Sequence, residues 1–420
     1  MRARLPLLAA LAVTLVTLAA CSRRERANPF DPGNPDTRGA PPGFVALAAD
    51  GRIDLRWDPV PTGGLTGYRL YRKTPIDTGY IAITTVLAPD RVSYADVGLQ
   101  NGLDHAYRLF FVLAGRGETA PAAEDVATPG PQRPWVAEAG AGRLLGITPD
   151  GRRIRIIHSG FDRPTVVAVD SVTGRVWFSD SFAGRVTSFD PGSGAVVNIP
   201  GLVSPGALAA EPLRQSVWVC DEQNDVVQEF SASGTPLGSP IEPVLTPIGI
   251  AIAAWDRSLW ICERGADRLR RYAADRSLIW SIPLAGPSRV ATDSVAQRAW
   301  VTSFETGQVY RIAPSGTVEL TLPGFGGPIG LAVDARRGHI WITEALADQI
   351  TVIDRSGAVV FRVPGLSETR DVAVDRETGE AWAVAPGSGE VVRIASDGRV
   401  VRRLSGLNGP FGVALDPGRP

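Results

Sequence analysis

The segment Gly330-Leu331-Ala332-Val333-Asp334, followed closely by Ile340-Trp341-Ile342-Thr343-Glu344, decides the fold because versions of it recur through the last two-thirds of the chain. The tryptophan returns at spacings of 42, 41, 42, 40, 41 and 41 residues, so seven of the ten tryptophans share one register. Self-similarity at such a period is the signature of a repeat architecture. The seven positions are Trp135, Trp177, Trp218, Trp260, Trp300, Trp341 and Trp382.

Each repeat carries the signals of four short strands. The apolar run around each tryptophan predicts a strand that is covered on both faces. A second strand follows, as at 185–189 and 308–312, then a third, more variable one and a fourth of small residues, as at 166–170. Glycines between the second and third strands suit hairpin turns with positive φ. They are Gly151, Gly192, Gly234, Gly316, Gly357 and Gly398, and the fourth strand is preceded by Pro164, Pro205, Pro247, Pro287, Pro328 and Pro410, a series broken only by Thr369.

Four strands in each repeat of this length match a β-propeller blade. The sequence therefore predicts an all-β protein in which residues 132–420 form a seven-bladed propeller. The small fourth strands suit the crowded central channel, and the tryptophans suit the wider space between blades. Because the chain enters at the strand of Trp135 and leaves after the strand of Val413, we expect these two strands to pair, which removes an exposed sheet edge.

The motif of a proline, the strand Gly330–Asp334 and then Ile340–Glu344 resembles NHL-type propellers and their relatives, the gluconolactonase-like hydrolases and the streptogramin lyases. The resemblance covers residues 133–420. It implies the propeller fold and a ligand-carrying face formed by the loops that directly follow the tryptophan strands, which the family counts as the second strand of each blade. The motifs are specific for the fold and say little about activity.

A separate β-sandwich is predicted for residues 43–128. Short alternating segments separated by Gly, Pro and Asp are typical of such a fold. Ile53, Leu55 and Trp57 alternate onto one face, and Tyr107 opens a late strand in the manner of a tyrosine corner. These segments resemble a fibronectin type III domain, a fold that serves as spacer, adhesin or scaffold. We interpret this domain as a spacer and His105 as a structural histidine.

The N-terminus has the features of an export signal. Residues 1–20 combine two early arginines, an apolar run and small residues at the end, which together are typical of a signal peptide. The sequence Leu18-Ala19-Ala20-Cys21 resembles a bacterial lipobox, which implies acylation of Cys21 and, with Ser22, sorting to the outer membrane. An ordinary signal peptide cleaved near Ala20, with Cys21 incidental, is the alternative. Residues 21–42 are polar and proline-rich, and we expect them to form a tether.

The charge balance argues against a polyanionic partner. The chain has 43 basic and 44 acidic residues and a formal net charge of −1. Such a chain has no overall positive field to hold nucleic acid.

An acidic residue stands three positions after the repeat tryptophan in five of the seven blades. Under the family resemblance these residues open the ligand-side loops, where they could form an acidic ring for a cation, an amine or a basic peptide. The alternative is structural: each carboxylate accepts backbone N–H groups in its own loop. Ser303 and Ala385 interrupt the series. The five acids are Glu138, Asp180, Asp221, Glu263 and Glu344.

Arginines provide the second set of candidate ligand residues. Arg264, Arg163 and Arg370 are expected on or near the same face, where they could bind a carboxylate or a sugar acid by bidentate contacts. Scattered surface arginines are the alternative. Phe304 and Phe325 could add an apolar patch there or serve packing.

The sequence offers little for catalysis. A lyase or lactonase would need a general base or a metal on the ligand face. His158 is predicted on an outer strand, and His339 lies toward the opposite face. Cys220 and Cys262 occupy equivalent places in adjacent blades, where a turn of about 51° leaves their Cα atoms about 10 Å apart, too far for a disulfide. We expect free, buried thiols.

The sequence thus favours a non-catalytic lipoprotein of the cell envelope. It would be anchored through Cys21 to the outer membrane, facing the periplasm or the cell surface. One face of its propeller would bind an unknown protein or carbohydrate ligand, with Arg264 and the five acids as candidate contacts and no cofactor. The alternative is a metal-dependent hydrolase or lyase of the gluconolactonase or streptogramin lyase type, in which the acids would supply oxygens to calcium.

Overall fold

The computed structural model describes residues 27–131 and 133–416 of the chain. Its contacts divide the chain into two compact units, Met1–Gly130 and Pro131–Pro420. The predicted signal peptide and Cys21 lie outside the described residues. Within the described ranges, no helix is both long and apolar enough to cross a membrane.

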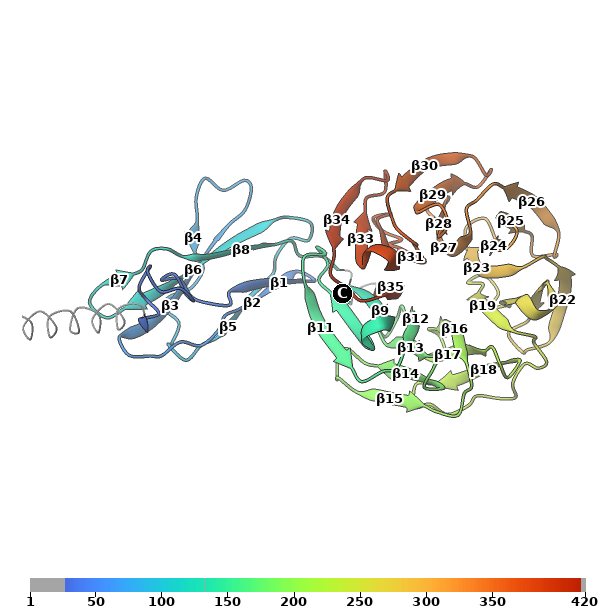
Figure 1. The fold of residues 1–420 in the computed structure, drawn as a ribbon, viewed down its shortest axis with the longest axis horizontal. Helices are drawn as coiled ribbons and strands as arrows, with labels where there is room; N and C mark the ends of the chain where they lie inside the picture. The colour runs from blue at the N-terminus through green and yellow to red at the C-terminus, as the bar shows by residue number, and fades with distance from the viewer. Residues whose placement is uncertain (1–26, 132, 417–420) are drawn as a thin grey trace, which may run out of the picture. The chain divides into compact units, whose positions relative to one another are not determined.

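The first unit is a β-sandwich of two antiparallel sheets (Figure 1). One sheet has the order β1-β2-β5, and the other has the order β4-β3-β6-β7, with β8 pairing along β6. The strands are β1 (Val45–Ala49), β2 (Arg52–Arg56), β3 (Leu65–Lys73), β4 (Ile81–Ala82), β5 (Ser93–Val97), β6 (His105–Leu113), β7 (Gly117–Glu118) and β8 (Ala123–Ala127).

The sandwich core contains the residues that the alternating pattern selects. Ile53, Leu55 and Trp57 are all buried, as predicted. Tyr107 is fully buried, and its hydroxyl donates a 2.9 Å hydrogen bond to the carboxylate of Asp96. In a tyrosine corner the tyrosine hydroxyl bonds to the backbone. Here the hydroxyl donates to a side chain instead. Arg72 donates to both oxygens of Asp96, at 3.0 and 2.9 Å, and balances its charge.

The described part of the expected tether is folded onto the sandwich. Asn34 is buried, and its carboxamide oxygen accepts the N–H groups of Asp36 and Thr37 in a series of turns. Phe30 packs against the sandwich core, with its ring 4.9 Å from that of Phe111 in an edge-to-face arrangement. Residues 28–42 therefore differ from the predicted extended segment because one aromatic residue gives them an apolar anchor.

The sandwich should lose stability as the pH falls. His105 is 3 % exposed, and neither ring nitrogen has a hydrogen-bond partner in the described structure. Burial lowers the pKa of His105, so the unfolded chain takes up the proton first as the pH falls through about 6.5. We expect hydrogen-exchange protection of β6 and β8 to decrease from pH 7.5 to pH 5.

The variant His105→Phe should flatten this pH dependence. An NMR titration of the His105 ring provides an independent readout, since the folded chain should titrate below the usual histidine range. An unshifted ring titration, or an equal pH slope in the variant, would contradict the assignment.

The second unit is a closed propeller of seven antiparallel sheets surrounding a central axis (Figure 1). This confirms the predicted fold. The blades are: blade 1, β35 (Pro410–Asp416), β9 (Arg133–Glu138), η1 (Ala139–Ala141), β10 (Arg143–Ile147) and β11 (Ile154–Ser159); blade 2, β12 (Pro164–Val169), β13 (Val176–Asp180), β14 (Arg185–Phe189) and β15 (Val196–Ile199); blade 3, β16 (Pro205–Glu211), β17 (Ser216–Asp221) and β18 (Val226–Ser231); blade 4, β19 (Pro247–Ile252), β20 (Leu259–Glu263), η2 (Arg264–Ala266), β21 (Arg268–Tyr272) and β22 (Leu278–Pro283); blade 5, β23 (Pro287–Asp293), β24 (Arg298–Ser303), β25 (Gln308–Ile312) and β26 (Val318–Pro323); blade 6, β27 (Pro328–Asp334), β28 (His339–Glu344), β29 (Gln349–Asp354) and β30 (Val359–Pro364); blade 7, β31 (Asp371–Val374), β32 (Ala381–Ala385), η3 (Pro386–Ser388), β33 (Glu390–Ile394) and β34 (Val400–Leu404).

The ring closes as the sequence predicts. β35 pairs with β9, with Val413 opposite Val136 and Ala414 opposite Trp135. Each small-residue strand is the inner strand of its sheet, and the six prolines of the series each begin one of these strands. In blade 7, where Thr369 replaces the proline, the inner strand begins later, at Asp371.

The repeat tryptophans are 0 to 3 % exposed and form the packing between blades. The predicted glycine turns are confirmed in most blades, where positive φ is adopted, but not at Gly192, since Gly194 takes that conformation in blade 2. In blade 4 a non-glycine residue, Arg276, has a φ of 75°. Its guanidinium lies over the Trp218 ring, 5.0 Å from the centroid, and pairs with Glu229 at 3.0 Å, contacts that hold it there.

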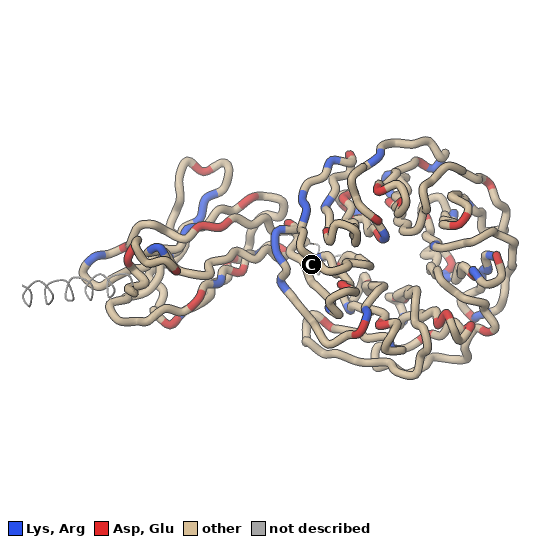
Figure 2. Tube along the Cα trace, in the orientation of Figure 1, with Lys and Arg blue, Asp and Glu red and all other residues tan. Residues whose placement is uncertain are grey.

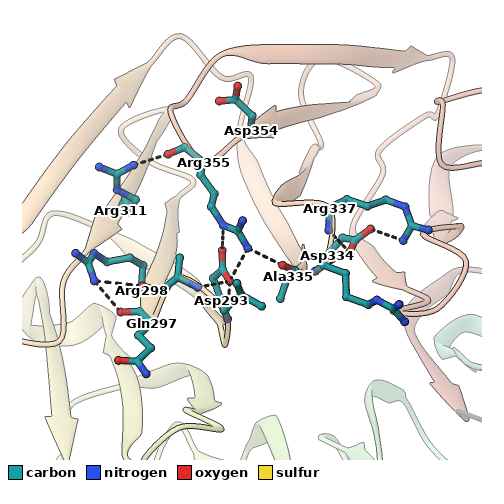
Figure 3. A network of polar contacts seen from close by, with 12 residues as sticks. Asp293, Gln297, Arg298, Arg311, Asp334, Ala335, Arg337, Asp354 and Arg355 are labelled. Carbon is teal, nitrogen blue, oxygen red and sulfur yellow. Dashed lines mark hydrogen bonds and ion pairs between the residues drawn. The ribbon is translucent and has the colours of Figure 1, made fainter.

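Ion pairs join neighbouring blades at the end of the inner strands (Figure 3). Asp293 ends β23 of blade 5 and accepts hydrogen bonds from Arg355 of blade 6, at 2.6 Å from Nε and 3.1 Å from Nη2. Arg355 also donates to the carbonyl of Ala335, and its own carbonyl accepts from Arg311. Because Asp293 also accepts the N–H groups that follow it in its turn, this end of the strand is occupied by structural contacts.

Candidate functional site

The five predicted acids are buried within their own blades and do not form an open ring. Glu138, Asp180 and Glu263 are 0 % exposed, Asp221 1 % and Glu344 3 %. Each lies at the end of the tryptophan-bearing strand, which is the second strand of a blade when strands are counted outward from the inner one. Each accepts a backbone N–H from the loop that precedes an inner strand.

The register of this contact is constant. The donor lies 18 residues before the acid at Asp162 for Asp180, Val203 for Asp221, Leu245 for Glu263 and Gly326 for Glu344. In blade 1 the donor comes from the other end of the chain, because this blade closes the ring. The backbone N–H of Asn408 donates to Glu138 at 2.7 Å. Most of the acids also hold a side chain five residues later, as Asp180 holds Arg185 at 2.8 Å.

These contacts favour the structural interpretation of the acids. Their oxygens are already used by backbone N–H groups and by cationic or polar side chains, so they are not free to coordinate a ligand. Among the described residues no group of three or more His, Cys, Asp or Glu side chains could hold a metal ion.

Removing one of these acids should destabilise the propeller. In Asp180→Ala the N–H groups of Asp162 and Arg163 and the guanidinium of Arg185 lose their acceptor. Removing one partner of a buried pair costs about 3–5 kcal/mol. We expect urea denaturation to show a loss of that order, whereas Asp162→Ala, at an exposed carboxylate of the same loop, should leave the unfolding free energy within about 0.5 kcal/mol of wild type. Equal stability of the two variants would refute the anchoring role.

The loops that the acids anchor surround a cavity of about 630 Å³. Its lining comes from the first residues of several inner strands and from the loops after the second strands, so it lies at one end of the central channel. This volume is in the range of small-molecule sites. The lining residues are Glu222, Ile248, Arg264, Ser288, Arg289, Phe304, Glu305, Ile329, Ala345, Leu346, Glu368, Arg370 and Phe411.

Charged side chains without ion-pair partners are gathered around this cavity. Three arginines and three glutamates line it, yet no ion pair within 4.0 Å joins any of them to another described residue. The arginines are Arg264, Arg289 and Arg370, of which Arg370 lies over the Phe411 ring at 4.9 Å from the centroid. Apolar side chains such as Phe304 complete the wall. The cavity thus offers free donors and acceptors beside an apolar surface.

Partial burial changes the protonation of Glu222. Desolvation raises its pKa, and the positive charges of Arg264 and Arg289 oppose that rise. Asp371, the next residue after Arg370, behaves similarly: burial raises its pKa while Arg289 and the N–H groups of Val372 and Val413 lower it. Glu222 is therefore a carboxyl group in the cavity that keeps its proton to a higher pH than an exposed glutamate does.

Several sequence candidates are brought together and others are not. Arg264, Arg370 and Phe304 line the cavity, and Arg163 lines an adjoining hollow that shares Arg370. Phe325 packs into the core between blades 5 and 6 instead.

The histidines and cysteines lie away from the cavity. His158 sits on the outer strand β11, against Phe189, and His339 begins β28 opposite Asp354. Cys220 and Cys262 are free and buried, as predicted.

Sequence reasoning missed Arg289 and Glu222. Arg289 occupies the third position of its inner strand, where blades 4, 6 and 1 have Gly249, Gly330 and Gly412. At Gly330 a Cβ would lie 2.5 Å from the carbonyl oxygen of Arg370, which shows how closely the inner strands approach. A large cation at a position that is glycine in three other blades is the signal that could have identified Arg289.

Comparison with known proteins supports this fold. The family model described as the virginiamycin B lyase family matches residues 163–419, more than half of the chain. The chain belongs to the virginiamycin B lyase family. A search of the curated proteins gave no significant match.

Solved structures resemble the propeller of this family member at low identity. A catalytically inactive variant of virginiamycin B lyase from Staphylococcus aureus, with a histidine replaced by alanine and with quinupristin, is 18% identical with a TM-score of 0.50, covering 58% of this chain and 84% of that one. A functionally unknown protein from Desulfotomaculum acetoxidans is 18% identical (TM-score 0.58; 68% and 99% covered). A putative 6-phosphogluconolactonase from Bacteroides uniformis is 12% identical (TM-score 0.58; 68% and 100%). At these identities the likeness concerns the fold.

Proposed function

We propose that the chain is a non-catalytic lipoprotein of the cell envelope that binds a carboxylate-bearing ligand in the cavity of Arg264, Arg289 and Arg370. The observation that supports it most directly is the set of charged side chains that line one cavity without ion-pair partners. Carboxylates are bound best by guanidinium groups, whose paired N–H donors match the two oxygens. The ligand is a small carboxylate or the acidic group of a protein or carbohydrate partner.

The remaining parts of the chain fit this role. Acylation of Cys21 would anchor the protein to the outer membrane, facing the periplasm or the cell surface. The strand order β1-β2-β5 against β3, β6 and β8 is compatible with a fibronectin type III-like domain, which would act as the spacer. Acidic and basic residues are interspersed around the propeller (Figure 2), which favours a partner other than nucleic acid.

Replacing one cavity arginine should weaken anion binding. Hexanoate, titrated by ligand-observed NMR, combines a carboxylate with an apolar tail that suits the lining. Since a charge-assisted hydrogen bond contributes about 1.5–3 kcal/mol, Arg289→Gln should bind hexanoate roughly tenfold or more weakly. Arg362→Gln, at an exposed position on β30, is the matched control and should bind like wild type. Unchanged binding in Arg289→Gln would refute the proposed site.

An enzyme is the second candidate, and the protonation of Glu222 favours it. The related lyase is described as inactive when a histidine is lost, and in this chain His158 and His339 do not line the cavity. A reaction of this type would therefore depend on Glu222 as the group that gives or takes the proton. Incubation with quinupristin, followed by mass spectrometry, tests this directly. Turnover by wild type that Glu222→Gln abolishes would overturn the non-catalytic proposal.

A further inference from the structure

A second hollow of about 490 Å³ adjoins the cavity. The two share three lining residues, Glu368, Arg370 and Phe411, so they are neighbouring parts of one surface. The rest of the smaller hollow comes from blades 1, 2 and 7. It includes Arg163 and Phe182.

Two arginines line this hollow, each stacked on a phenylalanine. Arg163 lies 5.0 Å from the centroid of Phe182, and Arg370 lies 4.9 Å from that of Phe411. A guanidinium stacked on a ring is restrained in orientation, while the N–H donors in its own plane stay available. Neither guanidinium has a carboxylate partner within 4.0 Å among the described residues. The pair is therefore arranged to receive an anion.

The position of Arg163 is fixed by the scaffold. Its backbone N–H donates to the buried Asp180 at 2.8 Å, and the neighbouring Asp162 N–H donates to the same carboxylate. Asp180 is itself held by Arg185. The loop is thus anchored through a buried ion pair, although the Arg163 side chain is exposed. Phe182 is 66 % exposed, a large apolar surface beside this cation.

We propose that the smaller hollow is a second anion subsite and that the ligand is an extended molecule with two carboxylates, one for each hollow. This inference rests on the proposed function of the larger cavity. One carboxylate binds Arg264 and Arg289, and the other binds Arg163 and Arg370. The chain between them lies along Phe411, which lines both hollows. Asp162 and Glu368, which also line the smaller hollow, accept hydrogen bonds from hydroxyl or amide groups of the ligand and disfavour a fully anionic chain.

Linear dicarboxylates of increasing length test the spacing of the two subsites. The probes are adipate, suberate and sebacate, each compared with the monocarboxylate of equal length by NMR titration. A second carboxylate that is bound by a guanidinium should tighten binding roughly tenfold or more at the matching length. Arg163→Gln should abolish that advantage while hexanoate binding stays at the wild-type value. Arg362→Gln should keep both.

The outcomes separate this inference from the one it rests on. If hexanoate binds and depends on Arg289 but no dicarboxylate binds more tightly, the second subsite is refuted and the first stands. If Arg163→Gln and Arg362→Gln lower dicarboxylate affinity equally, the effect is one of net charge, and the second subsite is again refuted. If neither class of acid binds, both proposals fail.

Discussion

The cavity face depends on one repeated interaction. In this interaction a buried carboxylate accepts hydrogen bonds from the backbone N–H groups of a loop in its own blade. In blade 2 Asp180 accepts from Asp162 and Arg163, and in blade 6 Glu344 accepts from Gly326. Each contact joins the end of the second strand to the loop that leads into the inner strand. The loops that line the cavity are therefore held by the same bonds that stabilise the blades.

This anchoring explains how unpaired charges persist around the cavity. Charged side chains on mobile loops can rearrange to reach counterions, whereas side chains on a fixed backbone reach only the partners within their own length. Here the backbone N–H of Arg163 donates to Asp180. The backbone N–H of Glu222 donates to the carbonyl of Ser204, whose own N–H donates to Asp221. The free-energy cost of leaving opposite charges unpaired is offset by the stability of the closed ring, as is common at functional sites.

The repeat made the fold predictable because packing imposes the same demand in every blade. Tryptophan between sheets, proline before the inner strand and glycine where inner strands approach closely are all local requirements, so they recur at a period that the sequence displays. The first unit was predictable for a similar reason, since Ile53, Leu55 and Trp57 are spaced two residues apart and all fall on the core face. The packing of Phe30 on the sandwich was not, because a single aromatic residue in a proline-rich segment has no periodicity.

The same regularity drew the sequence-based search for a ligand site to residues that have structural contacts. The five acids drew attention because they repeat, and repetition in a propeller reports a structural need common to all blades. A ligand, by contrast, is asymmetric and contacts each blade differently, so the residues that bind it must depart from the repeat. Arg289 stands where other blades have glycine, and Glu222 stands where others have Ala139, Ser181 or Ala345. Residues that depart from the repeat on the inner strands and ligand-side loops therefore locate the cavity better than the five regularly repeated acids do. The distances between these residues depend on the geometry of the closed ring and cannot be obtained from the sequence.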